Sequence, residues 1–346
     1  MKILITGAAG FIGSNFIRYM IKKYPNYNFI NYDKLTYAGN LGCVKDLEEE
    51  PNYLFVKGDI CDINFLTHLM KDVDCVVHFA AESHVDNSIS YHIPTEDPAK
   101  RTLGNSLEFT RTNVYGTHAL LEASKIRKIK KFIHISTDEV YGDIINGSFK
   151  ESDKLSPNNP YSATKAAAEM ITVGHYRSYK TPIIIVRGNN VYGPYQHPEK
   201  IIPRFITNIL LNKKLPLHGD GSYIRTYIHV DDFCEALHNI FQNGVIGDTY
   251  NIGTNNEISN IKLAKILLKK MGKDENLIEF VTDRPFNDRR YSIDTEKISL
   301  LGWNQKITFQ EGLDKTIEWY KKNKEWWDEL IKAEENKPPS YQNYVK

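Results

Sequence analysis

Short apolar runs rich in β-branched residues recur along the first half of the chain, and each is followed by a longer segment with helical periodicity. The runs are KILITG (2–7), FINYD (29–33), LFVKGD (54–59), CVVHFA (75–80), KFIHIST (131–137) and PIIIVRG (182–188). Strands that alternate with helices form a parallel sheet covered on both faces, joined by right-handed crossovers. The pattern therefore predicts an α/β fold built on a Rossmann-like, doubly wound parallel sheet.

The strand and helix alternation loosens after residue 190, where turn formers become frequent. A chain of 346 residues also exceeds the usual size of one domain. We expect a Rossmann domain in residues 1–190, to which helices and strands return from the C-terminal half, and a smaller α/β lobe made mainly of residues 191–330. A new helix is expected near Ser259 and a last helix over residues 309–330. A polar tail, 331–346, should follow.

Charge and cysteine content exclude several classes of partner. Forty-four basic and 43 acidic residues leave a formal net charge of +1, so no global field favours nucleic acid or an anionic membrane. The four cysteines form no CxxC pair and no metal-ligand spacing with the eleven histidines, which predicts reduced thiols and no metal site. No stretch resembles a signal peptide or a membrane span of ~20 apolar residues. We expect a soluble cytoplasmic protein, with residues 90–105 as a polar surface loop.

The segment GAAGFIG places Gly7, Gly10 and Gly13 where the first expected strand turns into the first helix. Bare backbone there permits a tight turn and lets a diphosphate approach the helix N-terminus. The GxxGxxG spacing departs from GxGxxG, so the strand, turn and helix context carries the prediction. Asp33 ends the second expected strand, where a carboxylate can bind ribose hydroxyls and repel a 2′-phosphate. The pattern predicts NAD rather than NADP, although Asp33 could merely start a turn.

Two further expected strands end at the same edge of the sheet, in GD (58–59) and in the small residues Ala80 and Ala81. The adenine and ribose of the cofactor would lie there. From these positions the expected NAD contacts are Gly7, Gly10, Gly13, Asp33, Asp59, Ala80 and Ala81.

Tyr161 and Lys165 are four residues apart on an expected helix, so they share one face, and an ammonium near a phenol favours the phenolate. A tyrosinate can take the proton of an alcohol as hydride leaves its carbon. The YxxxK spacing alone decides nothing, because it occurs five times, at Tyr19, Tyr53, Tyr161, Tyr176 and Tyr320. Only the Tyr161 copy follows a strand that ends in a hydroxyl residue, Thr137, and begins its helix after a proline.

Two carboxylates, Asp138 and Glu139, follow Thr137 in ISTDEVYG (135–142). Successive side chains of a strand face opposite ways, so both could reach one substrate only if the strand ends here, as VYG indicates. A neighbouring anion would raise the pKa of one carboxylate and supply an acid beside a base. Alternatively, the pair could merely cap the turn and bind backbone amides.

Motifs over residues 1–325 resemble the nucleotide-diphosphoglucose 4,6-dehydratases of the extended short-chain dehydrogenase/reductase family. Besides ISTDEVYG and YSATK, the segments that carry the resemblance are AAESHVDNS (80–88), NVYGTHALLEA (113–123), RGNNVYGPYQHPEKIIP (187–203), IRTYIHVDD (224–232), YNIG (250–253) and DRPFNDRRYSID (283–294). Related epimerases carry small or hydroxyl residues at position 138, and the similar decarboxylases carry serine. The Asp138–Glu139 pair is therefore the most specific part of the resemblance.

The resemblance implies a lyase that acts early in rhamnose or other deoxysugar synthesis. NAD+ would take hydride from C4 of the sugar and NADH would return it to C6. Tyr161 would be the catalytic base, Lys165 its partner, and Thr137 a substrate ligand. The resemblance also implies NAD contacts from Phe11, Ile12, Lys34, Thr36, Ile60, Ser83, Thr112, Tyr161, Lys165 and Asn190. Glu139 would remove the C5 proton, and Asp138 would protonate the C6 hydroxyl as water leaves.

Local positive charge is expected to bind the nucleotide diphosphate, with arginine able to bind it through two parallel hydrogen bonds. The sequence departs from bacterial dTDP-glucose enzymes at His218, which replaces a tyrosine, and at Asn287, which replaces a histidine. These segments look more like the dehydratase domain of eukaryotic UDP-rhamnose synthases, which favours UDP-glucose over dTDP-glucose. The expected substrate contacts are Ser83, Thr137, Asn190, Lys200, Ile201, Pro216, His218, Arg225, Asn260 and Arg284.

Two other functions remain open at this stage. One is a 4-epimerase or decarboxylase on the same scaffold, and the other is a non-catalytic NAD-binding regulator, which would need no Thr137, Tyr161 and Lys165 set. The resemblance also implies a homodimer in which helices near 113–125 and 161–178 form a four-helix contact.

Overall fold

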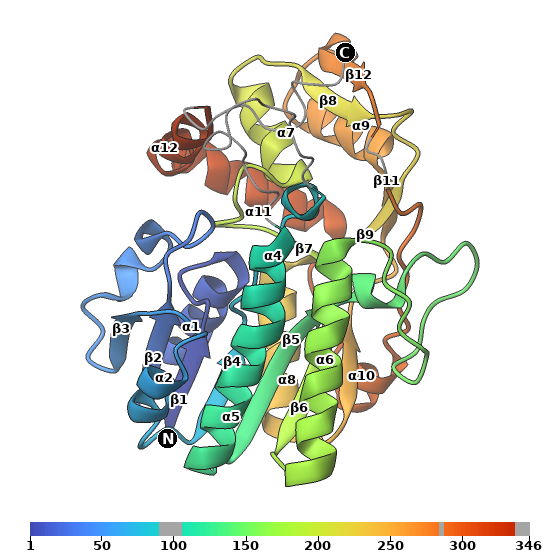
Figure 1. Ribbon diagram of the computed structural model, residues 1–346. Coiled ribbons are helices and arrows are strands. Elements are labelled where there is room, and N and C mark those ends of the chain that lie inside the picture. Colours follow the sequence, from blue (N-terminus) through green and yellow to red (C-terminus); the bar gives the residue numbers. More distant parts are fainter. Residues whose placement is uncertain (90–105, 284–286, 336–346) are drawn as a thin grey trace, which may run out of the picture.

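The computed structural model describes residues 1–89, 106–283 and 287–335. A parallel sheet of seven strands in the order β10-β6-β5-β4-β1-β2-β3 forms one half of the molecule (Figure 1). The six predicted strands are all present, and the doubly wound α/β fold is confirmed. The strands are β1 (Lys2–Thr6), β2 (Asn28–Asp33), β3 (Tyr53–Lys57), β4 (Cys75–His78), β5 (Lys131–Thr137), β6 (Ile183–Gly188) and β10 (Thr249–Ile252).

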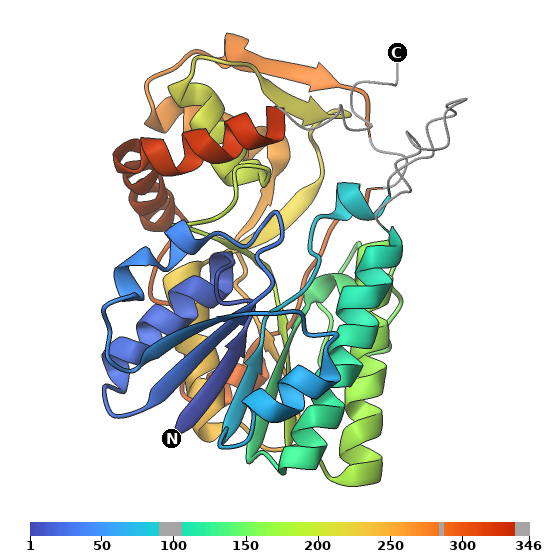
Figure 2. The same ribbon diagram turned by 60° about the vertical axis from the view of Figure 1, so that its left-hand side comes forward.

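Helices cover both faces of this sheet (Figures 1 and 2). Alternate strand residues belong to separate cores, with Ile3 and Ile5 on one face and Leu4 on the other. Burial of both faces explains why the strands read as continuous apolar runs. One face carries α1 (Phe11–Lys23), α8 (Val230–Asn243) and α10 (Glu296–Leu300), and the other carries α2 (Ile63–Leu69), α5 (Thr117–Arg127) and α6 (Pro160–Tyr179).

The second lobe contains two small sheets and a core of its own. Its strands pair as β11-β9-β7 and as β12-β8. As expected, a helix begins after Ser259, whose side chain accepts a hydrogen bond from the backbone of Lys262 and caps it. The elements are β7 (Asn190–Tyr192), β8 (Leu215–His218), β9 (Ile224–His229), β11 (Glu257–Ser259), β12 (Ile278–Val281), α7 (Ile201–Leu210), α9 (Asn260–Lys270), α11 (Phe309–Lys322) and α12 (Lys324–Glu335).

The expected single helix over 309–330 is wrong, because the chain breaks at Asn323 into α11 and α12. The Asn323 side chain donates to the carbonyl oxygen of Trp319 at 2.8 Å, and such local bonds make asparagine a poor residue for a helix interior. The break lets Trp327 become fully buried, with Nε1 donating to the carbonyl oxygen of Tyr320 at 2.8 Å. Helix α12 continues to Glu335, five residues into the segment expected to be a tail.

A continuous helical segment leads from α4 (Ser106–Phe109) through the π-helical turn η4 (Thr110–Gly116) into α5. Wide π turns concentrate at functional sites. The buried Asn113 side chain in η4 donates to the carbonyl oxygen of Glu82 and accepts from its backbone nitrogen, which ties the residues after β4 to this helix. Shorter helices are η1 (Leu41–Cys43), η2 (Lys45–Leu47), α3 (Val85–Ser88) and η6 (Glu275–Leu277).

The segment 90–105, expected to be a loop, lies outside the described residues, as do Arg284 and residues 336–346. Among the helices that the structure describes, none combines the length and the apolar character needed to cross a bilayer.

Candidate active site

A cavity of about 350 Å³ lies at the carboxyl ends of the parallel strands and is also lined by residues of the second lobe. Open α/β sheets bind their ligands in this position, where neighbouring crossovers leave a crevice. All seventeen residues expected to contact NAD line this cavity, from Gly7 in the first turn to Asn190 in β7.

The glycine turn allows the backbone to pack closely at one end of the cavity. Gly7 has φ of +73°, and a Cβ there would lie 2.5 Å from the backbone nitrogen of Ala80. A Cβ on Gly13 would lie 2.4 Å from the carbonyl oxygen of Gly7. Gly10 caps α1 without a side-chain hydrogen bond, so the first-turn N–H groups of α1 can receive an anion.

Asp33 both starts a turn and lines the cavity. Its carboxylate accepts hydrogen bonds from the backbone nitrogens of Ala9 at 3.0 Å and Leu35 at 2.8 Å. Nearby, Lys34 Nζ lies 3.0 Å from Asp59 Oδ2. These contacts fix the two carboxylates at the edge where the ribose and adenine are expected.

The strand β5 ends at Thr137, and the next residues form the 3₁₀ helix η5 (Asp138–Tyr141). Thr137 caps this turn, since its hydroxyl accepts from the backbone nitrogen of Glu139 at 3.3 Å and donates to Asp138 Oδ1 at 3.2 Å. The predicted end of the strand is thus confirmed. The turn brings both carboxylates to the lining of one cavity.

Two asparagines hold these carboxylates. Asn189 Nδ2 donates to Asp138 Oδ2 at 2.8 Å, and Asn159 Nδ2 donates to Glu139 Oε2 at 3.3 Å. Sequence reasoning missed both residues. The only signals for them were the short segments RGNN and NNP, and neither indicates where its asparagine side chains point.

The pKa values of the two carboxyl groups are separated by their surroundings. Burial, followed by the negative charge of Glu139, raises the pKa of Asp138 to about 7. Burial also raises the pKa of Glu139, but the positive charges of Arg225 and Lys200 oppose this effect. Glu139 is therefore favoured as the ionised partner and Asp138 as the group that keeps a proton near neutral pH.

Helix α6 presents Tyr161 and Lys165 to the same cavity. Burial and then the charges of Glu139 and Asp138 raise the pKa of the Tyr161 phenol, while a hydrogen bond from Thr137 lowers it. Burial lowers the pKa of Lys165 to about 8. The Lys165 ammonium donates a hydrogen bond to the carbonyl oxygen of Ile135 at 2.7 Å.

A buried ion pair supports this helix one turn further along. Glu169 is fully buried and accepts hydrogen bonds from the Arg187 guanidinium, the shortest at 2.6 Å. Arg187 also donates to the Tyr141 hydroxyl at 2.6 Å. The charge of Glu169 opposes the lowering of the Lys165 pKa. This network links α6, β6 and η5 beneath the reacting groups.

The expected substrate residues divide into two groups. Ser83, Thr137, Asn190, Lys200 and Ile201 line the cavity, whereas the described second-lobe residues Pro216, His218, Arg225 and Asn260 do not. Trp326 and Leu330 of α12 also line it. The sequence carried no signal for either, because α12 reaches the cavity through tertiary packing.

Arg225 lies behind the carboxylates. Its guanidinium donates to Asn287 Oδ1 and to the carbonyl oxygen of Asp288, both at 3.0 Å, and lies 4.7 Å from the centre of the Tyr291 ring. Asn287 is one of the two positions at which the sequence differs from bacterial dTDP-glucose enzymes. Its side chain holds Arg225, whose charge lowers the pKa values of both Asp138 and Glu139.

The family model for GDP-mannose 4,6 dehydratase matches residues 4–316. The chain belongs to this family. It is 47% identical over 340 residues to a trifunctional UDP-glucose 4,6-dehydratase, 3,5-epimerase and 4-keto-reductase of Arabidopsis thaliana, a match that covers 96% of this chain and 49% of the plant protein. The chain thus spans about half the length of the plant relatives it matches.

Two further members of the family match over nearly their whole length. The human dTDP-D-glucose 4,6-dehydratase is 42% identical over 345 residues, which covers 97% of this chain and 95% of the human protein. The crystal structure of a dTDP-glucose 4,6-dehydratase from Streptomyces venezuelae with NAD bound has a TM-score of 0.89 and 42% identity, and the match covers 95% of this chain and 100% of that chain.

Proposed function

We propose that this protein is an NAD-dependent nucleotide-diphosphoglucose 4,6-dehydratase, a lyase that converts UDP-glucose or dTDP-glucose into the 4-keto-6-deoxy sugar. The observation that carries the proposal is the turn after Thr137, which brings Asp138 and Glu139 to the same cavity as Tyr161 and Lys165. Oxidation of an alcohol needs only the hydroxyl, the phenol and the ammonium. Elimination of water also needs an acid and a base.

The cavity fits NAD at three points. Close backbone packing at Gly7 and Gly13 leaves no room for a Cβ and forms the tight turn before α1, whose cap is open to an anion such as a diphosphate. Asp33 lies where the ribose hydroxyls are expected, and its negative charge disfavours a 2′-phosphate. When bound, NAD supplies a hydride acceptor for C4 of the sugar and a hydride donor for C6.

Tyr161 accepts the proton of the C4 hydroxyl, and Thr137 positions that hydroxyl. The raised pKa of Tyr161 means that the phenol holds its proton strongly when the site is empty. Positive charges close to the phenol must therefore favour the phenolate when cofactor and substrate are bound. Lys165 is buried on the same face of α6 and supplies one such positive charge.

Glu139 then removes the C5 proton, which the new C4 ketone has made acidic, and Asp138 donates a proton to the C6 hydroxyl as it leaves as water. The separated pKa values support this division of roles, because Asp138 keeps a proton to near pH 7. Return of hydride to C6 and of the proton to C5 completes the reaction. Each proton transfer contributes about 10²- to 10⁴-fold in rate.

Mass spectrometry tests the function directly. The protein is incubated with UDP-glucose and with dTDP-glucose, without added cofactor, and we expect a product lighter by one water and no net NADH. If neither sugar loses water, the proposed function is wrong. If the sugars are converted without loss of water, and Asp138→Asn leaves that turnover nearly intact, a 4-epimerase or decarboxylase is favoured instead.

We propose UDP-glucose as the preferred substrate, bound mainly by the second lobe in residues 191–330. The preference rests on the resemblance of the segments around His218 and Asn287 to UDP-rhamnose synthases. Binding by the lobe is supported by Lys200 at the cavity and by Asn260, whose buried Oδ1 has no hydrogen-bond partner among the described residues. An unpaired buried acceptor favours a ligand that donates a hydrogen bond. Competition between the two sugars in one reaction measures the preference.

A homodimer through α5 and α6 is proposed as the assembly. Large apolar side chains are exposed on this side of the molecule, at Tyr115, Ile126, Met170 and Tyr179, with exposed fractions of 53–56%. Light scattering should show twice the mass of the chain. The four free cysteines support a reducing, cytoplasmic compartment.

A further inference from the structure

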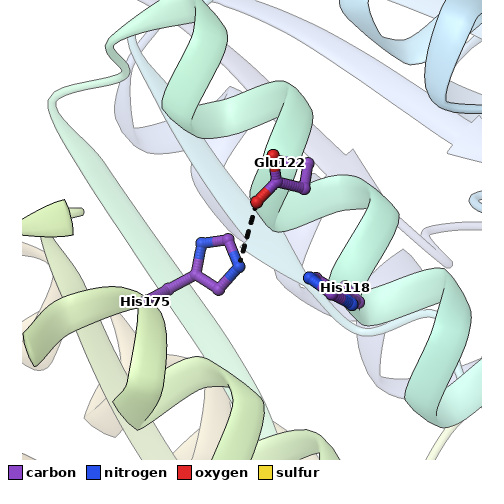
Figure 3. Close-up of side chains that lie close together, drawn as sticks. All are labelled: His118, Glu122 and His175. Atoms are coloured by element: carbon purple, nitrogen blue, oxygen red, sulfur yellow. Dashed lines mark ion pairs between the residues drawn. The ribbon is translucent and has the colours of Figure 1, made fainter. Parts of the chain in front are cut away.

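Two histidines and a glutamate meet on the outer side of α5 and α6, away from the active-site cavity. One nitrogen of His118, one nitrogen of His175 and one carboxylate oxygen of Glu122 all lie within 4.8 Å of one another. Figure 3 shows the His175 ring directed toward Glu122, with His118 one turn along the same helix as Glu122. The three side chains converge on one point between the two helices.

The helix geometry accounts for this convergence. His118 and Glu122 are four residues apart on α5 and therefore share a face. His175 comes from α6, which packs against α5. The spacing of cysteines and histidines in the sequence predicted no metal site, and it missed this cluster because the third member is supplied by a separate helix.

His175 is held in place between the two helices. Its residue exposure is only 4%. Nε2 lies 3.4 Å from Glu122 Oε1, while the buried Nδ1 has no hydrogen-bond partner within the described residues. A cation can replace the Nε2 proton if that proton moves to Nδ1, so the ring stays neutral and the carboxylate faces the cation.

The donor set selects a class of cation. Two imidazole nitrogens and one carboxylate oxygen suit Zn²⁺ and similar transition metals, whereas Mg²⁺ and Ca²⁺ prefer oxygen ligands alone. Zinc ligands at about 2.1 Å in tetrahedral geometry lie about 3.4 Å from one another. The exposed His118 side chain can close the remaining gap by a change of rotamer.

Lys125 competes for the same carboxylate. Its Nζ lies 2.6 Å from Glu122 Oε2 and 4.2 Å from the centre of the Tyr179 ring. A bound cation would share Glu122 with this ammonium and be repelled by it. The lysine therefore limits the affinity of the site for a cation, but it does not block the ring nitrogen of either histidine.

We propose that His118, Glu122 and His175 form a binding site for one divalent transition-metal cation of the Zn²⁺ type. All three ligands belong to one chain, so the site needs no second copy, although it lies on the two helices of the proposed dimer contact. It is independent of the proposed sugar chemistry.

Calorimetric titration of the tag-free, chelator-treated full chain with Zn²⁺ tests the site without any nucleotide sugar. We expect one Zn²⁺ per chain and affinity at least about tenfold weaker in His118→Ala and in Glu122→Gln. His68→Ala removes an exposed histidine of α2 and is the matched control, with unchanged affinity expected. Equal Zn²⁺ affinity in the wild type, His118→Ala and Glu122→Gln would overturn the proposal, as would Mg²⁺ binding as tightly as Zn²⁺.

Lys125→Ala gives a second, opposite readout. Because this change frees Glu122, we expect Zn²⁺ to bind about two- to fivefold tighter, the range of a surface ion pair. Co²⁺ absorption in the visible range should report nitrogen ligation in the wild type and weaken in His118→Ala. Unchanged or weaker Zn²⁺ binding in Lys125→Ala would count against the assigned carboxylate.

Discussion

The sheet half and the second lobe build the candidate site in different ways. In the sheet half, every residue expected to contact the cofactor lines the cavity, whereas Pro216, His218, Arg225 and Asn260 of the second lobe lie outside that lining. Parallel strands bring their carboxyl ends to one edge whatever the rest of the chain does. No comparable rule of topology fixes where the side chains of the second lobe lie. We therefore expect changes in the sheet half to alter the rate of reaction, and changes in the lobe to alter substrate affinity.

The largest effect is expected from Tyr161→Phe, which removes the group that accepts the C4 hydroxyl proton. The turnover number should fall by about 10²- to 10⁴-fold with little change in KM. Tyr19→Phe alters another YxxxK copy, whose hydroxyl accepts from Lys23, and serves as the control. Steady-state kinetics measures the turnover number and KM of both variants. A Tyr161→Phe enzyme with normal turnover would remove the basis for placing the chemistry in the sheet half.

Asp138→Asn should lower the rate of water elimination by about 10²- to 10⁴-fold, while oxidation at C4 continues. The amide keeps the size of the side chain but cannot donate an acidic proton. In deuterated water, Glu139 should still exchange the C5 hydrogen of the sugar, which mass spectrometry detects. Loss of both exchange and elimination would show that the two carboxylates do not act separately.

A smaller effect is expected from Arg225→Gln in the second lobe. Arg225 does not line the cavity, but loss of its positive charge behind the carboxylates should weaken the attraction of the anionic substrate and raise KM about tenfold. The positive charge of Arg225 lowers the pKa of Glu139, so removal of this charge should raise that pKa. Because Glu139 must be ionised to act as a base, the acidic side of the pH profile should move to higher pH.

The alkaline side of the wild-type pH profile should fall as Asp138 loses its proton near pH 7. Arg289→Gln, at an exposed neighbour, is the control for Arg225→Gln. If Arg225→Gln lowers the turnover number and leaves KM and the pH profile unchanged, the division between rate and affinity fails.

The smallest effect is expected from Gly174→Ala in α6. A Cβ at this helical position meets no atom within 4 Å, so the free energy of unfolding should rise by up to about 1 kcal/mol. Gly147→Ala also enters open space, but at φ of +80°, and should lose about 1 to 2 kcal/mol. Thermal unfolding measures both. Since neither change touches the lobe, a shift in KM would contradict the comparison.

The fold was largely predictable from the sequence because the pattern of the sheet is local. Six strands were predicted from apolar runs, and the end of β5 from the segment VYG that follows the two carboxylates. The seventh strand, β10, was not among those runs, since four residues beside a glycine carry little signal. The break at Asn323 was missed because apolar periodicity continues across it.

The candidate site was predictable only where a motif fixes its own geometry. The glycine turn and the 137–139 segment do so, because their neighbours in sequence are also their neighbours in space. Asn159, Asn189 and Trp326 reach the site through contacts between distant segments. A single polar or aromatic residue in a loop or amphipathic helix does not indicate such contacts.

The seventh strand also affects how the protein can be made. β10 pairs with β6, which comes 61 residues earlier, so this side of the sheet has no partner until residues 249–252 have left the ribosome. The intervening chain includes α8, which covers the core against α1. Unpaired strand edges and uncovered apolar faces invite aggregation. The nascent chain should therefore need protection by chaperones over this interval, and a product truncated before β10 should be insoluble even though it contains every residue of the catalytic turn.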